Sequence, residues 1–577
     1  MTPDRVLEVP FAAGGSREGP LTLAQDNVLR VLRELRDAGD PYTMNLWLSA
    51  PVPHGTTFGR IETALRDLLE THEVLRTTYR AGAQTTQVAV AAGSLSCGVY
   101  EAGQRMRATA ERLRWLMLGR HFEVDAELPI RVAVLTSEGT PVRLLAALSH
   151  LAVDAAAVEV LADDLGELLR TGARPQRRFA ARQPIDQAAA ERDPAAQRRA
   201  EAALAFWRRA LERGPQAMFS LPARPAGDTG EYRQARLRSP AIAIAVGAIA
   251  AQTRTSRSTV LLAAVVALLG LRTANDACLL SMLAGNRVAP GLRRYVGPLA
   301  QDALLSVSLD VDGFHELVRQ VWAASLAAYR HSQYDAAALR RVWSRVSEQH
   351  GTWYARDCVY NDLSTPMPAG PAEDPGLLRA AIAGALPRAE LTWEPAESLP
   401  AAFIFYVHRL DTDAELSLWA RTDQLPAADV EGFLLGVQRL LVVAAAGPVR
   451  LAGLASVTGL AAGARGPGWL RVGNSWVDPA AVRGLLLDVP GVRDAAVLAE
   501  PDAGTRHRLV AYLLSAGDMR TPRALHAACV AALPGRETAI APHRYVLCAS
   551  APRDRDSAAE WRAQPVLADG NGRHPVL

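Results

Sequence analysis

Apolar residues along the first half of the chain recur with two different periods. Helical spacing over 60–71 and over 155–165 predicts an amphipathic helix in each stretch. Between them, 130–135 and 142–148 are short apolar runs of the length typical of buried strands. Strand-like and helix-like stretches alternate again over 236–447. The pattern therefore predicts an α/β fold in both halves of this part of the chain.

Changes in composition mark where these parts connect and end. Residues 171–202 are rich in Arg, Gln, Ala and Asp and contain prolines, which predicts an exposed connection between two lobes. Residues 448–468 contain five glycines, a composition typical of a linker. Beyond the linker, a helix over 480–487 and strands over 494–499 and 509–514 predict a small separate α+β unit.

The most informative polar residues stand where the strand over 142–148 ends. His150 follows that strand, and Asp154 comes four residues later, directly before the apolar helical pattern. A histidine at a strand exit can take or hold a proton near neutral pH. An aspartate just beyond it can lock the turn that aims the ring. By itself a His-x-x-x-Asp pattern is common, so its meaning depends on the rest of the chain.

Charge and composition exclude several classes of function. All 63 basic residues are arginine, the net charge is only +3, and no basic run is interleaved with aromatic residues. This distribution argues against binding of nucleic acid. The longest apolar stretches, 241–251 and 259–271, are shorter than the roughly 20 residues that a membrane span needs. No signal peptide is evident at the N-terminus, so we expect no membrane association.

The five cysteines are scattered and form no C-x-x-C pair. We therefore expect no metal or redox centre, and buried reduced thiols in a cytoplasmic protein. With 577 residues, the chain is long enough for about three compact units at roughly 150 residues each.

A series of motifs through the first 447 residues resembles nonribosomal peptide synthetase condensation domains, whose superfamily includes chloramphenicol acetyltransferase. Ser149-His150-x-x-x-Asp154-Ala155 resembles their His-His-x-x-x-Asp-Gly signature. The other matching segments follow in the family's order: 21–25, 72–77, 120–131, 205–208, 284–287 with 296–297, 329–339 and 360–362. Their order makes a chance resemblance implausible.

The resemblance implies two chloramphenicol acetyltransferase-like lobes in a V-shaped pseudo-dimer, plus a small α+β C-terminal domain. In that fold His150 sits at the junction of the lobes, in a tunnel open at both faces. The expected division of the chain is an N-terminal lobe over 1–175, a C-terminal lobe over 176–447, the linker over 448–468, a degenerate adenylation-type subdomain over 469–550 and a flexible tail over 551–577.

The same resemblance implies a stand-alone acyltransferase of natural-product and antibiotic biosynthesis, with amide formation as the leading hypothesis and ester formation as the alternative. The donor would be an acyl thioester on the phosphopantetheine arm of an acyl or peptidyl carrier protein, and the acceptor an amine. His150 would be catalytic, and Asp154 would pair with Arg287 to set the loop. Ser149, Ala155 and Asn361 are the candidates to line the tunnel or contact substrate. Asn361 could equally have a strand-end role, and Ser149 could be a tolerated replacement. His72 and Arg76 would be structural, no cofactor would be bound, and the protein would work as a monomer.

Several positions depart from the family's pattern. Ser149 replaces the first signature histidine, and Ala155 replaces a glycine, adding a methyl group where close approach or positive φ can be wanted. The segments 299–302 and 336–338 also differ from the family's residues. Because of these departures, a domain that binds its partners without catalysing a reaction is an alternative.

Residues 469–550 resemble the small C-terminal subdomain of adenylation domains, with eroded motifs. A lysine of that subdomain meets the reacting carboxylate and phosphate in adenylate-forming enzymes. This chain has no lysine at all, and Asn571-Gly572-Arg573 comes too late to replace the Asn-Gly-Lys motif. The chain also lacks a Gly-rich phosphate loop. We therefore expect a remnant or docking module that does not use ATP.

Two other functions stay open at this point. Condensation-like domains with degraded signatures recruit tailoring enzymes in some assembly lines, and Ser149 and Ala155 favour that role. A coenzyme A-dependent acyltransferase would share the His-x-x-x-Asp pattern. It is disfavoured because the eroded C-terminal subdomain indicates an assembly-line ancestry.

Overall fold

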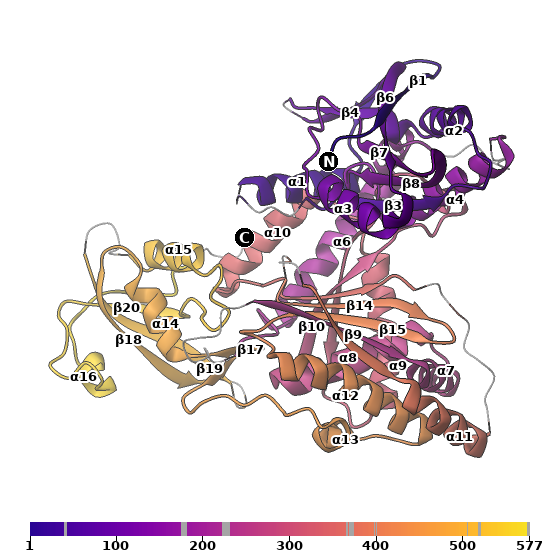
Figure 1. Ribbon diagram of the computed structural model, residues 1–577. Coiled ribbons are helices and arrows are strands. Elements are labelled where there is room, and N and C mark those ends of the chain that lie inside the picture. The colour runs from indigo at the N-terminus through magenta and orange to yellow at the C-terminus, as the bar shows by residue number, and fades with distance from the viewer. Residues whose placement is uncertain are drawn as a thin grey trace. The chain divides into compact units, whose positions relative to one another are not determined.

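In the computed structural model the chain forms two compact units (Figure 1). The structure describes residues 1–573 except 38, 40–42, 83, 175–181, 222–230, 365–366, 368–373, 397–398, 400, 503, 505 and 517–520. The first unit comprises 1–202, 284–301 and 333–336, and the second unit comprises the remaining segments. The expected lobe boundary between 175 and 176 lies outside the described residues. The observed division differs from the expected two lobes because segment 284–301 belongs to the first unit.

A five-stranded sheet forms the centre of the first unit, in the order β1-β6-β7-β8-β3. Its strands are β1 (Arg5–Ala12), β6 (Ala92–Glu101), β7 (Ile130–Ser137), β8 (Thr140–Leu148) and β3 (Leu46–Pro51). Helices α2 (Phe58–Thr71) and α4 (Ala155–Thr171) share one apolar core with the sheet. Helix α3 (Met106–Leu118) packs on residues of β7 and β8 in a separate cluster, so these strands are buried on both faces.

These elements agree with the hydrophobic pattern. The strands predicted over 130–135 and 142–148 are β7 and β8, and the helices predicted over 60–71 and 155–165 are α2 and α4. Helix α4 runs six residues further than predicted, to Thr171, where Gly172 takes the left-handed conformation (φ 75°) that ends it.

A smaller sheet lies beside the N-terminal helix of the first unit. Its strands are β2 (Arg17–Pro20), β5 (Thr86–Ala89) and β4 (Thr77–Arg80), in that order. Helix α1 (Leu23–Asp37) packs through Val28 and Leu29 on Tyr79 of β4 and on Leu151. Helix α5 (Pro184–Glu191) contributes to the first unit, and the division into units falls within α6 (Pro194–Arg213).

The second unit is built on a seven-stranded sheet in the order β11-β10-β12-β14-β15-β9-β13. Its strands are β11 (Gln301–Ser308), β10 (Ala277–Ala284), β12 (Cys358–Asp362), β14 (Phe403–Leu410), β15 (Ala414–Arg421), β9 (Tyr232–Ser239) and β13 (Glu390–Glu394). Its helices are α7 (Pro240–Thr253), α8 (Arg257–Thr273), α9 (Phe314–Arg330), α10 (Ala336–His350), α11 (Pro375–Ala385), α12 (Ala427–Ala446) and α13 (Leu454–Thr458). Strands β10, β12 and β14 pair in parallel, as expected where helices connect them.

Helices α7 and α8 are apolar almost all round because they lie in the core of the second unit. Most of their residues are buried. Among the described residues, no single helix is long and apolar enough to cross a membrane, although this pair, bent by 101°, reaches the required length and composition together.

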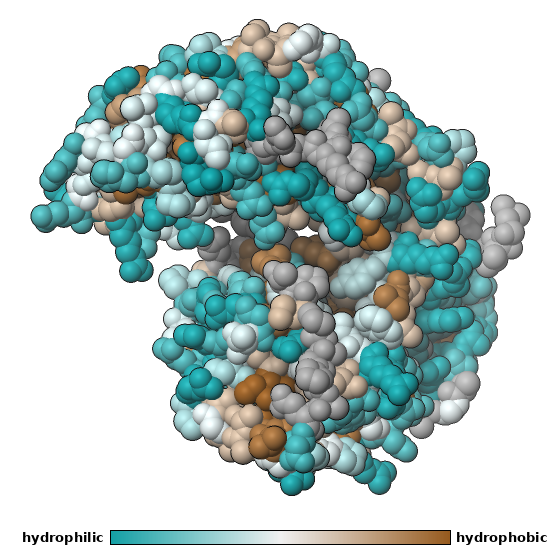
Figure 2. Space-filling model, turned by 90° about the vertical axis from the view of Figure 1, so that its right-hand side faces the viewer, coloured by the Kyte–Doolittle hydropathy of each residue, from teal (hydrophilic) through white to brown (hydrophobic). Residues whose placement is uncertain are grey.

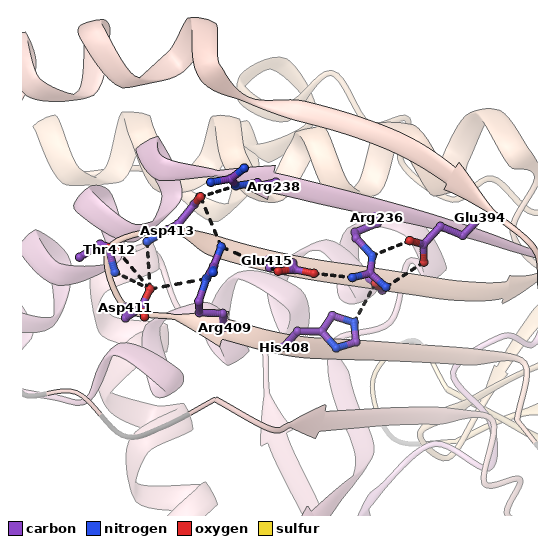
Figure 3. A network of polar contacts seen from close by, with 10 residues as sticks. Arg236, Arg238, Glu394, His408, Arg409, Asp411, Thr412, Asp413 and Glu415 are labelled. Atoms are coloured by element: carbon purple, nitrogen blue, oxygen red, sulfur yellow. Dashed lines mark hydrogen bonds and ion pairs between the residues drawn. The ribbon is translucent and has the colours of Figure 1, made fainter. Parts of the chain in front are cut away.

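A network of charged side chains covers one face of the strands β9, β13, β14 and β15 (Figure 3). Arg236 of β9 lies between Glu394 and Glu415, with its Nε 2.7 Å from Glu394. In the antiparallel registers Arg236 lies opposite Thr392 and Ser417, and each glutamate stands two positions further along its strand, so the charges form diagonal cross-strand pairs. Charges on the edge strand β13 also disfavour pairing with another chain's strand.

The C-terminal part of the chain contains its own sheet, in the order β18-β19-β20-β21. The elements are β16 (Leu470–Val472), β17 (Ser475–Val477), α14 (Pro479–Leu487), β18 (Val492–Pro501), β19 (His507–Ser515), α15 (Pro522–Ala532), β20 (Arg544–Cys548), α16 (Ala558–Arg562) and β21 (Val566–Gly570). Helices α14 and α15 pack on one apolar core with the sheet. The predicted helix and two strands are α14, β18 and β19.

This C-terminal part is hydrogen-bonded to the rest of the second unit. The side-chain amide of Gln216 donates to the carbonyls of Glu537 (2.9 Å) and Ala539 (3.0 Å). The indole of Trp476 donates to the carbonyl of Ala274 (2.8 Å). Because of these bonds, the predicted subdomain over 469–550 is part of the second compact unit.

The predicted linker and the predicted tail are both ordered where the structure describes them. In the linker over 448–468, the Arg465 guanidinium stacks on Trp476 and donates to the carbonyls of Ser220 and Thr273. The expectation of a flexible tail over 551–577 is wrong for its described part, which contains α16 and β21. Trp561 of α16 is buried against the sheet, and the packing of this large apolar side chain fixes the position of the segment.

All five cysteines are free and buried, as the sequence predicts. On the face drawn in Figure 2, hydrophilic residues cover most of the surface and hydrophobic ones are scattered in small patches. Scattered apolar residues of this kind are normal for a protein surface.

The buried Asp357, directly before β12, predicts that the stability of the second unit depends on pH. Its carboxylate accepts the backbone N–H of Phe219 (2.9 Å), and burial raises its pKa to about 7. An unfolded chain gives an aspartate a pKa of about 3.9, so between about pH 4 and 7 the native state binds more protons at this group. We therefore expect this group to lower the free energy of unfolding as the pH rises through that window.

Urea unfolding at pH 5 and pH 7.5 checks this expectation. Asp357→Asn should lose less stability than the wild type between the two values, because asparagine does not ionise. Asp310→Asn, at an exposed position of the same unit, should show the wild-type change in the free energy of unfolding between the two pH values. The same change in all three proteins would show that Asp357 does not titrate in this range.

Candidate active site

The turn between β8 and α4 carries the signature residues. Leu148, the last residue of β8, pairs with Ile130 of β7 and Leu46 of β3. The next residue, Ser149, donates its N–H to the carbonyl of Pro129 (3.0 Å), and its own carbonyl accepts the N–H groups of Ala152 and Val153. His150 therefore stands in a tight turn that is anchored to the sheet on one side and to α4 on the other.

The His150 ring is half-buried, and its Nδ1 atom is enclosed. None of the residues that the structure describes hydrogen-bonds this Nδ1. Because Nδ1 is enclosed, Nε2 is the ring nitrogen that can meet a reactant, and no hydrogen bond joins it to a described residue. Among the described residues no carboxylate bonds the ring, so the backbone turn sets its position.

Asp154 is the anchor of the loop. It is the N-cap of α4, and its Oδ1 accepts the N–H of Ala157 (2.9 Å). Its Oδ2 also accepts the backbone N–H groups of Leu299 (2.9 Å) and Ala300 (3.2 Å). A carboxylate at the N-terminus of a helix is stabilised by the helix dipole and by such N–H donors.

Arg287 completes the anchor with a two-pronged ion pair. Its two terminal nitrogens lie 2.6 Å from Oδ1 and 2.8 Å from Oδ2 of Asp154. The guanidinium also donates to the carbonyl of Gly297 (2.9 Å). Both side chains are largely buried, with 4% of Asp154 and 11% of Arg287 exposed. A bidentate, buried pair fixes both position and orientation.

A second arginine of the same segment holds α4 further along. Arg294 lies 2.7 Å from Oδ1 of Asp164, and His72 lies 2.9 Å from its Oδ2. His72 is thus a structural residue that joins the end of α2 to α4, as the resemblance implied. The sequence reasoning missed Asp164 and Arg294. The sequence signal for Asp164 was a charged residue at an inward-packing position of the helical pattern that begins at Ala155. In the structure Asp164 is only 2% exposed.

The two departures in the signature are accommodated within the first unit. Ala155 is the first residue of α4, is exposed, and is not among the residues with positive φ. Its methyl group therefore causes no strain in the turn. Ser149 is 1% exposed, and its hydroxyl oxygen accepts the N–H of Leu151 (3.3 Å).

Five of the six candidate residues, all except Asn361, come together in the first unit. Asn361 belongs to the second unit, on β12, where the register places it beside Tyr406 of β14. Burial raises the pKa of the Tyr406 hydroxyl, and the neighbouring Asn361 side chain lowers it.

The family model for the condensation domain matches residues 16–351. This chain belongs to the condensation-domain family. The match includes the β8–α4 turn and segment 284–301, which together carry the anchor of His150. No curated protein matches the chain in sequence.

Solved structures show the same condensation-domain fold at low sequence identity. The X-domain from teicoplanin biosynthesis is 20% identical, with a TM-score of 0.58 over 77% of this chain and 98% of that one. The condensation domain of the Monacolin K polyketide synthase MokA is 18% identical, with a TM-score of 0.59 over 76% and 100%. The first condensation domain of the calcium-dependent antibiotic synthetase is 16% identical, with a TM-score of 0.57 over 76% and 98%. These likenesses establish the mixed α/β, chloramphenicol acetyltransferase-like fold.

Proposed function

We propose that this condensation-family protein is an enzyme that forms an amide bond. The donor is an acyl thioester on the phosphopantetheine arm of a carrier protein, and the acceptor is an amine. The observation that carries the proposal is the geometry of His150: its turn is fixed by the buried Asp154–Arg287 pair, and its Nε2, unlike the enclosed Nδ1, can meet a reactant and has no hydrogen-bond partner among the described residues.

The chemistry requires one proton to be moved. The amine nitrogen attacks the thioester carbonyl carbon, the carbon–sulfur bond breaks, and the sulfur leaves as a thiol. His150 takes the proton from the attacking nitrogen and returns it to the leaving sulfur, so that atoms and charges balance. A positioned histidine supplies about 100-fold to 10,000-fold in such a step. Holding both reactants in one site supplies a further large share of the rate.

The C-terminal region over 469–550 is proposed as a degenerate adenylation-type subdomain with a docking role. The absence of lysine from the whole chain supports this part of the proposal, since no ammonium group exists to stabilise an adenylation transition state. Its hydrogen bonds from Gln216 to the carbonyls of Glu537 and Ala539 support a fixed attachment to the second unit.

A second candidate is a domain that recruits a partner protein without catalysis. The likeness to the teicoplanin X-domain favours it, because that domain has been solved in complex with OxyB. The replacement of the first signature histidine by Ser149 also favours it. The retained His150, Asp154 and Arg287 favour catalysis. A coenzyme A-dependent acyltransferase is the third candidate.

Intact-protein mass spectrometry of loaded carrier proteins separates the three functions. Each carrier is incubated with the protein and candidate amines, and in parallel the same acyl groups are offered on coenzyme A. Loss of the acyl group from the carrier, with a matching amide product, is the expected result. Turnover from coenzyme A alone would establish the third function. No turnover with any pair, together with tight binding to a carrier or a tailoring enzyme, would establish recruitment.

A further inference from the structure

A preformed pocket in the first unit lies beside the residue that precedes His150. It has a volume of about 220 Å³. Its most deeply buried lining residues are Leu29 of α1, Tyr79 of β4, Phe122 and Ser149. Leu32 and Val124 add further apolar wall. A largely apolar pocket with a few polar groups is the usual form of a site for a small organic group.

The walls of this pocket are held rigidly by their own contacts. The Tyr79 hydroxyl donates to the carbonyl of Leu151 (3.0 Å). The Arg131 guanidinium stacks over the Phe122 ring at 3.8 Å and donates to the carbonyl of His121 (2.7 Å). Such contacts keep the pocket open without a ligand, so binding costs little free energy for ordering the pocket walls.

The chemistry of the lining selects the kind of ligand. The exposed rim carries two arginines and two acidic residues, so the rim has no net preference for either sign of charge: Arg33, Arg36, Glu123 and Asp125. The buried interior carries no charged side chain, so an ionised group would lose hydration without a partner there. An apolar cavity of about 150 Å³ accommodates benzene, so this pocket has room for a ring with a small substituent.

Ser149 supplies one directional contact. Its hydroxyl oxygen accepts the N–H of Leu151, and among the described residues it donates to no acceptor. A buried hydroxyl that lines an apolar pocket and keeps its proton favours a ligand with one hydrogen-bond acceptor. Serine is also much smaller than the histidine of the family signature, and its small size leaves this part of the pocket open.

We infer that the Ser149 pocket is a specificity site for an uncharged aromatic or similarly sized branched group that carries one hydrogen-bond acceptor. Resting on the proposed function, this group is the side chain of one of the two reactants. Because Ser149 and His150 are consecutive, their Cα atoms are only about 3.8 Å apart, so a group bound here lies close to the catalytic turn.

Ligand-observed fluorine NMR tests the pocket without any turnover. The probes are 4′-fluoroacetophenone, which has an acceptor, and 4-fluorotoluene, which has none. We expect the wild type to bind both, and the ketone more tightly. Ser149→His should fill the pocket and weaken both probes by about tenfold or more. Ser149→Ala should remove most of the preference for the ketone, since one hydrogen bond is worth about threefold to tenfold.

Two further variants keep the test decisive. Ser94→His places the same side chain at an exposed strand position and should bind both probes like the wild type. Leu32→Trp fills the pocket from α1 and should act like Ser149→His if that variant fails to fold. No binding by the wild type, or equal binding by the wild type and the folded filled variants, would overturn the inference.

A turnover panel then identifies which reactant enters the pocket. Carrier-bound acetyl and aryl-acyl donors are each paired with methylamine and with benzylamine. In Ser149→His, a lower ratio of aryl-acyl to acetyl transfer assigns the pocket to the donor, and a lower ratio of benzylamine to methylamine assigns it to the acceptor. Unchanged ratios would overturn the specificity role. Absence of turnover from every pair would defeat the proposed function, whereas probe binding would still establish the site.

Discussion

Asp154→Ala is expected to lower the free energy of unfolding by about 3–5 kcal/mol, because it leaves the buried Arg287 guanidinium without its counter-charge. The substitution also removes the N-cap of α4 and the acceptor of the Leu299 and Ala300 N–H groups. Thermal and urea unfolding measure the loss. We expect a clear fall in the melting temperature, and loss of activity as a consequence of the disordered turn.

Asp163→Ala is the matched control, because it removes another aspartate from the same helix. Asp163 is 70% exposed and lies 3.3 Å from Arg294. Exposed ion pairs contribute about 0–1 kcal/mol, so this variant should unfold almost like the wild type. A wild-type melting temperature for Asp154→Ala would refute the structural role of the Asp154–Arg287 pair.

His150→Ala is expected to give a folded protein that transfers the acyl group about 100-fold to 10,000-fold more slowly. The ring is half-buried, and its enclosed Nδ1 atom has no partner among the described residues, so its removal breaks no hydrogen bond there. The rate of amide formation from a loaded carrier protein measures the effect. Unfolding curves measured in parallel show that the loss is chemical.

His54→Ala is the control for that rate, because His54 is an exposed residue of the same unit. It should transfer the acyl group at the wild-type rate. If His150→Ala retained that rate as well, His150 would have no part in the mechanism, and the rate would have to come from positioning of the reactants alone.

The sequence predicted the elements that carry His150 because their hydrophobic pattern is strong. The apolar runs over 130–135 and 142–148 and the helical pattern from Ala155 are local signals, and they correspond to β7, β8 and α4. The pairing of Asp154 with Arg287 came from the family resemblance, and the structure confirms it. No spacing rule could have supplied it, since the two residues are 133 positions apart in the chain.

Other parts depended on tertiary contacts that one sequence does not show. The tail beyond residue 550 looked flexible because its pattern is weak, yet one buried residue, Trp561, fixes it. The glycines of segment 448–468 indicated a linker, and its attachment through Arg465 to two carbonyl groups could not be read from them. The Ser149 pocket is made by residues from α1, β4 and the segment before β7, which only folding brings together.

The placement of segment 284–301 in the first unit has a consequence for the order in which the protein is made. Arg287 and Arg294 bind Asp154 and Asp164 of a helix that leaves the ribosome long before they do. During that interval Asp154 and Asp164 have neither of their arginine partners, so the turn with His150 lacks its anchor. Synthesis of segment 284–301, near the middle of the chain, therefore decides when this turn can reach its final geometry.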